Sequence, residues 1–184
     1  MSYKNEKIKM IELHENGLDI QFRIRENGVV ELADFSSQEV KKAVMEPKED
    51  ICYPAVEIHR SGTGSLNMHA YKNNINQSSV DFVYENHELK AQAGGKELEI
   101  VMISPEKLKA VYHMRLFDGV PAVQTWTEII NEGSEDQGLT YVSSFMYQGI
   151  SRGGEKPYYK KTDIYVRLTA GAVRHSGRNT MQKR

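Results

Sequence analysis

Tight-turn dipeptides limit most strongly what this chain can fold into. Asn16-Gly17, Asn27-Gly28 and Asp118-Gly119 each stand between runs in which apolar and polar residues alternate. Such dipeptides favour the two-residue turns of β-hairpins, and alternation with a period of two is typical of strands with one buried face. The turns therefore predict a fold built from antiparallel hairpins.

Strand-like runs of this kind follow one another along most of the chain. The expected strands are residues 8–14, 18–25, 28–35, 56–59, 79–85, 88–92, 97–104, 107–117, 120–131, 139–148 and 158–167. Only residues 36–45 indicate a short helix, because a Ser-x-x-Glu capping pattern begins them and Pro47 follows. Many short strands and almost no helix predict an all-β protein, either an antiparallel sandwich or a barrel.

Composition indicates the cellular compartment and the kinds of partner that we expect for the chain. Its 184 residues suit one domain with a substantial core, and its net charge of -1 creates no overall field that would attract nucleic acid or a membrane. The single cysteine, Cys52, excludes a disulfide framework and fits a reducing compartment. With no secretory or membrane-spanning pattern, we expect a cytoplasmic protein without nucleic-acid or membrane partners.

The Asp118-Gly119 turn allows the register of one hairpin to be predicted. Phe117 faces Val120 across a two-residue turn, and counting outward assigns side chains alternately to two faces. One face is apolar and is expected in the core; its members include Leu108, Tyr112, Met114, Val123 and Ile129. The other face is polar, with predicted pairs Arg115–Ala122, His113–Gln124, Val111–Trp126 and Lys109–Glu128.

Trp126, the only tryptophan, belongs to the polar face of this hairpin. An indole is costly to leave in water and tends to find an apolar partner. Either a second layer or a loop covers it, or it forms part of a docking surface or a sugar-stacking platform. The candidate interface or sugar-stacking residues are Trp126, Val111, His113 and Gln124.

Recognised catalytic and metal-binding motifs are absent from the sequence. The six histidines form no H-E-x-x-H motif, one cysteine cannot build a cysteine-based zinc site, and no G-x-S-x-G occurs. Gly62-Thr63-Gly64 lacks the Gly-Lys-Ser/Thr ending of a phosphate-binding loop. Carboxylates are plentiful, but no pair stands out as the two that glycoside hydrolysis requires. The sequence predicts no catalytic residue, no metal site and no cofactor.

One block of residues resembles a known family. Arg115-Leu116, Pro121-Ala122-Val123, Trp126-Thr127-Glu128, Asn131-Glu132-Gly133 and Ser143-Ser144-Phe145 follow one another at characteristic spacings. The order resembles that in the N-terminal domain of family 36 glycoside hydrolases, the α-galactosidases or melibiases. Phe22-Arg23 to Leu32 and Pro54-Ala55-Val56-Glu57 extend the resemblance across most of residues 18–166.

The resemblance implies a β-supersandwich, similar to galactose mutarotase, and selects the sandwich over the barrel. In this family the domain precedes a (β/α)₈ barrel that carries both catalytic aspartates and binds the α-galactoside. No segment here matches the family's catalytic motifs, so we expect a non-catalytic, truncated and incomplete member with scaffold and oligomer-contact roles. The alternatives are a stand-alone carbohydrate-binding sandwich and a structural or interaction β protein with no link to sugars. A sandwich edge left without its neighbour is also expected to promote self-association.

Residues 167–184 differ from the preceding 1–166, which we assign to the sandwich domain. They contain no acidic residue and include Arg167, Arg174, Arg178, Lys183 and Arg184. They form a basic tail, a cloning remnant or a nucleic-acid arm, or they result from a frameshift near residue 167. One observation favours a frameshift. If the reading frame of these codons is shifted by two bases, a suitable choice of synonymous codons encodes a tryptophan-containing sequence that resembles the family's continuation.

Overall fold

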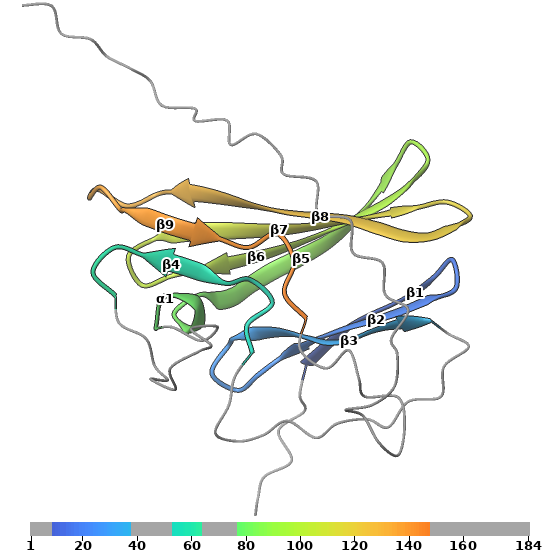
Figure 1. Ribbon diagram of the computed structural model, residues 1–184, viewed down its shortest axis with the longest axis horizontal. Helices are drawn as coiled ribbons and strands as arrows, with labels where there is room; N and C mark the ends of the chain where they lie inside the picture. Colours follow the sequence, from blue (N-terminus) through green and yellow to red (C-terminus); the bar gives the residue numbers. More distant parts are fainter. Residues whose placement is uncertain (1–8, 38–52, 64–76, 148–184) are drawn as a thin grey trace, which may run out of the picture.

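The computed structural model describes residues 9–37, 53–63 and 77–147. The described residues form antiparallel strands in two facing layers, with a short two-stranded pair beside them (Figure 1). The expected all-β antiparallel sandwich is confirmed. No helix among these residues is long and apolar enough to cross a membrane.

The first layer is a three-stranded sheet in the order β1-β2-β3. It contains β1 (Lys9–Glu15), β2 (Leu18–Ile24) and β3 (Val30–Ser37). Asn16 and Gly17 have φ values of 52° and 80°, as the predicted hairpin turn requires. Strand β2 alternates as the sequence predicted, and its buried side chains are Leu18, Ile20, Phe22 and Ile24.

The second layer is a four-stranded meander in the order β5-β6-β7-β8. Its strands are β5 (Val83–Gln92), β6 (Gly95–Ile103), β7 (Leu108–Phe117) and β8 (Val120–Asn131). Strand β5 is continuous where the sequence predicted two strands, 79–85 and 88–92. Each strand pairs with the next along the chain, so short turns suffice to connect them.

The core lies between these two sheets. Phe22 of β2 meets Tyr112 of β7 edge to face, with ring centroids 5.7 Å apart. Of the predicted core residues, Leu108, Tyr112 and Met114 are buried, whereas Val123 and Ile129 are partly buried and pack against the core. The predicted inward face of the hairpin is therefore correct.

The predicted pairing within that hairpin is wrong by two residues. Phe117 faces Val120 as expected, but a bulge follows and Leu116 pairs with Val123 instead of Pro121. Proline has no N–H to donate to the ladder, and the bulge at this point leaves Pro121 outside the pairing. As a result His113 faces Trp126 and Val111 faces Glu128. A shift of two residues keeps every side chain on its predicted face.

A short helix, α1 (Gln77–Val80), replaces the start of the predicted strand 79–85. The hydroxyl of Ser79 accepts a hydrogen bond from Ile58 N (2.9 Å) and donates one to Ile58 O (3.1 Å). These bonds satisfy the backbone of β4 (Ile58–Arg60), whose other neighbour is β9 (Leu139–Val142). Local side-chain bonding of this kind competes with strand pairing.

Several predictions fall partly or wholly outside the described residues. In the predicted helix 36–45, Ser36 and Ser37 belong to β3 and the remainder lies outside the description. The predicted strand 158–167, the tail 167–184 and the boundary between them also lie outside it.

Candidate functional site

The most polar surface built by the second layer is the side of that sheet turned away from the core, which we call the outer face. Cross-strand pairing and alternation place on it Glu88 and Lys90 of β5, Glu97, Glu99 and Val101 of β6, Lys109, Val111, His113 and Arg115 of β7, and Gln124, Trp126 and Glu128 of β8. Charged groups of both signs thus surround one histidine and the tryptophan.

The four residues singled out from the sequence all lie on the outer face. Val111 and His113 are buried, Trp126 is half-buried and Gln124 is exposed. Val111 and His113 belong to β7, which has a strand on each side, whereas the other two belong to β8 at the end of the sheet. Burial therefore follows the position of the strand.

Trp126 and His113 form a stacked pair. They lie directly opposite each other, with ring centroids 4.6 Å apart and an angle of 5° between the planes. The indole thus covers one face of the imidazole and fixes its orientation, because a ring held by parallel stacking cannot rotate freely. The immediate partner of Trp126 is therefore a histidine of the neighbouring strand.

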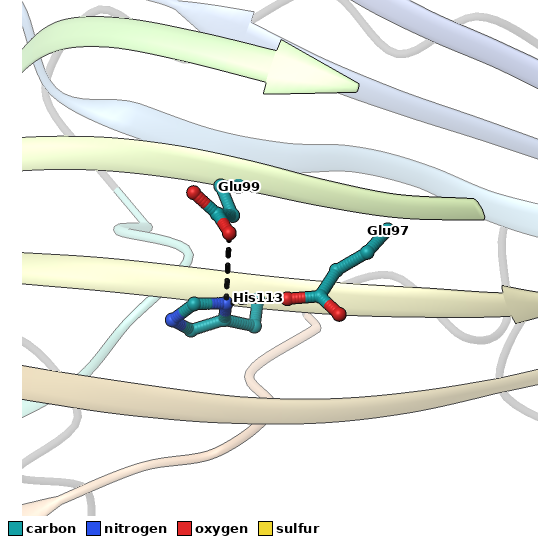
Figure 2. A group of neighbouring side chains, drawn as sticks. All are labelled: Glu97, Glu99 and His113. Atoms are coloured by element: carbon teal, nitrogen blue, oxygen red, sulfur yellow. Dashed lines mark hydrogen bonds and ion pairs between the residues drawn. The ribbon is translucent and has the colours of Figure 1, made fainter. Parts of the chain in front are cut away.

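Two glutamates of β6, which pairs with β7 on the side away from β8, approach the same histidine (Figure 2). His113 Nδ1 lies 2.9 Å from Glu97 Oε1 and 3.9 Å from Glu99 Oε1. One ligand-type atom from each of the three residues lies within 4.8 Å of the others. Glu97 and His113 are buried, 6% and 8% exposed, so the contact between them is shielded from water.

The second oxygen of each carboxylate is bound by a donor from β5. Gln92 Nε2 donates to Glu97 Oε2 (2.6 Å), and Lys90 Nζ donates to Glu99 Oε2 (2.5 Å). The hydrogen bond to Glu99 is the main cause that raises the pKa of the Lys90 ammonium above its usual value. Both carboxylates are thus oriented with Oε1 toward the histidine.

The remaining ring nitrogen of His113 has no hydrogen-bond partner. Nε2 is buried, and the carboxylate nearest to it among the ion pairs is Glu128, whose Oε2 lies 3.8 Å away. That distance exceeds a normal hydrogen bond. Glu128 is exposed, with 59% of its side chain accessible, and can change rotamer.

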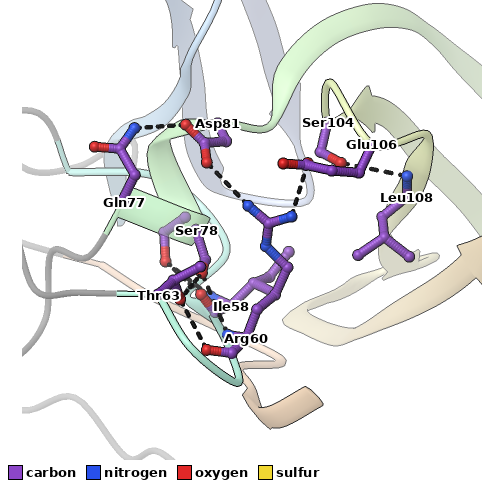
Figure 3. Close-up of polar contacts among 10 residues, drawn as sticks. Ile58, Arg60, Thr63, Gln77, Ser78, Asp81, Ser104, Glu106 and Leu108 are labelled. Atoms are coloured by element: carbon purple, nitrogen blue, oxygen red, sulfur yellow. Dashed lines mark hydrogen bonds and ion pairs between the residues drawn. The ribbon is translucent and has the colours of Figure 1, made fainter. Parts of the chain in front are cut away.

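A separate polar cluster surrounds Arg60 (Figure 3). The Arg60 guanidinium of β4 bonds to Asp81 Oδ2 (3.0 Å) after α1 and to Glu106 Oε2 (2.7 Å) in the β6–β7 turn. Gln77 Nε2 in turn donates to Asp81 Oδ1 (2.5 Å). These contacts join three elements and pair the charge of a buried arginine. A structural role therefore explains this cluster.

Glu97 and Glu99 are close enough to raise the question of glycoside hydrolysis. A retaining enzyme needs two carboxyl groups about 5 Å apart, one of which carries a proton to donate. Here Glu99 accepts from an ammonium, Glu97 accepts from an amide, and His113 lies against both. Glu97 and Glu99 act as hydrogen-bond acceptors. Together with His113 they are suited to bind a cation or a ligand rich in hydrogen-bond donors.

Sequence reasoning missed Glu97 and Glu99. Their spacing of two residues in a strand puts both on one face, which was available from the sequence. Their approach to His113 depends on the β6–β7 register, in which Glu99 faces His113 and Glu97 faces Arg115. The turn between those strands contains Lys107 at a φ of 62°, which no dipeptide signal announced.

Comparison with known proteins identifies no family for this chain. No family model matches the sequence, and no curated protein matches it. Among solved structures, the chain is similar to the GH36 α-galactosidase AgaA from Geobacillus stearothermophilus, with 12% identity and a TM-score of 0.41. The similarity covers 69% of this chain and 23% of that chain, so the chain spans about a quarter of its length.

Proposed function

We propose that this chain is a non-catalytic β-sandwich domain of an α-galactosidase-like glycoside hydrolase, with scaffold and oligomer-contact roles. The parent activity is hydrolysis of terminal α-galactosides with retention, carried by a separate catalytic barrel. The proposal rests on the sequence resemblance together with one structural observation about where its parts lie.

In that observation, two stretches that carry the resemblance contact each other through Glu57 and Ser143, which are 86 residues apart in the sequence. Ser143 N donates to Glu57 O (2.8 Å), and Glu57 N donates to Ser143 Oγ (2.7 Å). Thr127 Oγ1, from a third part of the resemblance, donates to Ser143 O (2.8 Å). The hydroxyls of Ser143 and Thr127 therefore have structural roles where the stretches meet, which supports a common domain design.

The aromatic residue that ends the same motif also contributes to packing. Phe145 meets Phe35 of β3 edge to face, with centroids 5.6 Å apart. The motif thus connects β8, the residue before β4 and the first sheet. Such contacts stabilise a scaffold and leave chemistry to other residues, in agreement with a non-catalytic role.

The coding DNA provides the direct test of this proposal. If the reading frame shifted by two bases after codon 166 encodes a (β/α)₈ barrel segment, the proposal is supported, and its absence contradicts it. The frame-restored protein is expected to release nitrophenol from a nitrophenyl α-galactoside. The 184-residue chain is expected to release none above background, and turnover abolished by one Asp or Glu substitution in it would overturn the non-catalytic role.

A carbohydrate-binding module remains the second candidate, favoured by the half-buried Trp126 beside the exposed Gln124 and Glu128. Aromatic rings flanked by polar groups suit the mixed apolar and hydroxyl surface of a sugar. Calorimetric titration of the chain with galactose and a methyl α-galactoside tests it. Binding that is lost in Trp126→Ala supports the module, and no heat with either sugar contradicts it.

A further inference from the structure

We propose that Glu97, Glu99 and His113 form a binding site for a divalent first-row transition metal ion such as Zn²⁺, with His113 Nδ1, Glu97 Oε1 and Glu99 Oε1 as ligands. The site is independent of the function proposed above. Imidazole nitrogen and carboxylate oxygen are ligand types that zinc accepts together, and three protein ligands leave a position for water.

The ligand atoms are spaced closely enough to bind one ion. Zinc binds these atoms at about 2.0–2.2 Å, which places neighbouring ligands of a tetrahedral site about 3.3 Å apart. The two separations from Nδ1, 2.9 Å to Glu97 and 3.9 Å to Glu99, lie on either side of that value. Small side-chain rotations on adjacent strands therefore suffice to complete the coordination.

The surrounding residues orient the proposed ligands. Gln92 and Lys90 occupy the second oxygen of each glutamate and leave Oε1 directed at the histidine. Trp126 holds the imidazole plane by stacking. Outer contacts of this kind fix ligand geometry in metal sites and are a normal part of their construction.

The unpartnered nitrogen of His113 fits the same arrangement. In the structure Nδ1 lies at hydrogen-bond distance from a carboxylate, which can only accept, so Nδ1 carries a proton. A metal ion that binds Nδ1 displaces this proton to solvent, and the metal-bound imidazole carries its proton on Nε2. Nε2–H then faces Glu128 Oε2, now 3.8 Å away, and a rotamer change of the exposed Glu128 supplies an acceptor. The result is the carboxylate–histidine–metal arrangement typical of such sites.

Charge on the outer face also favours a cation. Glu97, Glu99 and Glu128 surround His113. The cations of this face are Lys90, Arg115 and Lys109, of which Lys109 pairs with Glu132, so three carboxylates around His113 face Lys90 and Arg115. A bound divalent ion balances this excess.

The only tryptophan of the chain stacks on a proposed ligand and gives the experiment its own reporter. The full chain, freed of metal, is titrated with ZnCl₂ by calorimetry, and with NiCl₂ by Trp126 fluorescence, because Ni²⁺ quenches a neighbouring indole. We expect one zinc ion per chain and saturable quenching at the same stoichiometry.

Matched variants distinguish this site from general binding to surface acids and histidines. Glu99→Gln removes a ligand and is expected to weaken binding at least ~10-fold, since even outer contacts contribute that much. Glu88→Gln removes the same charge from the residue opposite Glu99 and is expected to leave affinity within about twofold. His59→Gln, which removes another histidine paired with a glutamate, is also expected to leave it unchanged.

Glu128→Gln provides a second measurement that does not disturb a buried residue. It weakens the acceptor for Nε2–H, and we expect a loss of affinity of about 10-fold with an unchanged circular dichroism spectrum. Absence of zinc binding by the wild-type chain overturns the proposal. Equal affinity in the wild type and Glu99→Gln also overturns it, as does a loss in Glu88→Gln equal to that in Glu99→Gln.

Discussion

At the residue scale, the contact between Trp126 and His113 determines how much the tryptophan contributes to stability. Aromatic pairs contribute about 0.5–1.5 kcal/mol beyond the area that they bury. We expect Trp126→Ala to lower the free energy of unfolding by about 1–2 kcal/mol and Trp126→Phe, which keeps a ring opposite His113, to lower it by less. Urea unfolding followed by circular dichroism measures both. A loss below about 0.5 kcal/mol, with an unchanged oligomeric state, would mean that the indole is an ordinary surface residue.

At the element scale, two glycines of the second sheet are expected to tolerate alanine very differently. Gly119 has a φ of 69° in the β7–β8 turn, and an added Cβ meets no atom within 4 Å. Gly95, at a φ of 158°, would place its Cβ 1.9 Å from Leu116 O. We expect Gly119→Ala to cost about 1 kcal/mol and Gly95→Ala to cost more than about 2 kcal/mol. Equal losses in urea unfolding would contradict the close approach at Gly95.

The contacts that join β4, α1 and the β6–β7 turn predict a dependence on pH. Burial acts to raise the pKa of the Glu106 carboxyl, but its bonds to its own backbone, Arg60 and Ser104 outweigh burial and place the pKa below the usual 4.5. A carboxyl with a depressed folded-state pKa contributes stability above pH 4.5 that is lost as the pH falls through the folded value. We expect Glu106→Gln to flatten this part of the acid unfolding profile. Glu88→Gln, exposed on β5, is the control that should leave it unchanged.

The β7–β8 hairpin shows which features of an element could be predicted from the sequence. Alternation assigned the correct face to Leu108, Tyr112 and Met114, because a bulge that shifts pairing by two residues preserves the faces. The pairs themselves could not be predicted from turn chemistry, since the bulge beside Pro121 changes the register after the first pair. The candidate site was only partly predictable for the same reason: Trp126 and His113 were singled out, but Glu97 and Glu99 reach them through the pairing of β6 with β7.

At the scale of the whole molecule, the sandwich has a long edge at β8. In the part of the chain that the structure describes, β8 pairs with β7 alone, and residues 120–127 contain no charged side chain. Strand β5, at the opposite edge, contains Glu85, Glu88 and Lys90. Charges on an edge strand discourage pairing with another chain, so β8 is the less protected edge.

This asymmetry predicts self-association through β8. We expect the mass in sedimentation experiments to rise above the monomer's 21.0 kDa as the protein concentration increases. Gln124→Lys introduces a charge at an exposed position of β8 and is expected to shift the chain toward the monomer. Leu89→Lys introduces the same charge on β5, where Leu89 is 43% exposed, and is expected to associate like the wild type. A wild-type chain that stays monomeric at every concentration, or a Gln124→Lys variant that associates as readily, would exclude β8 as the contact, because an added lysine there opposes edge-to-edge pairing.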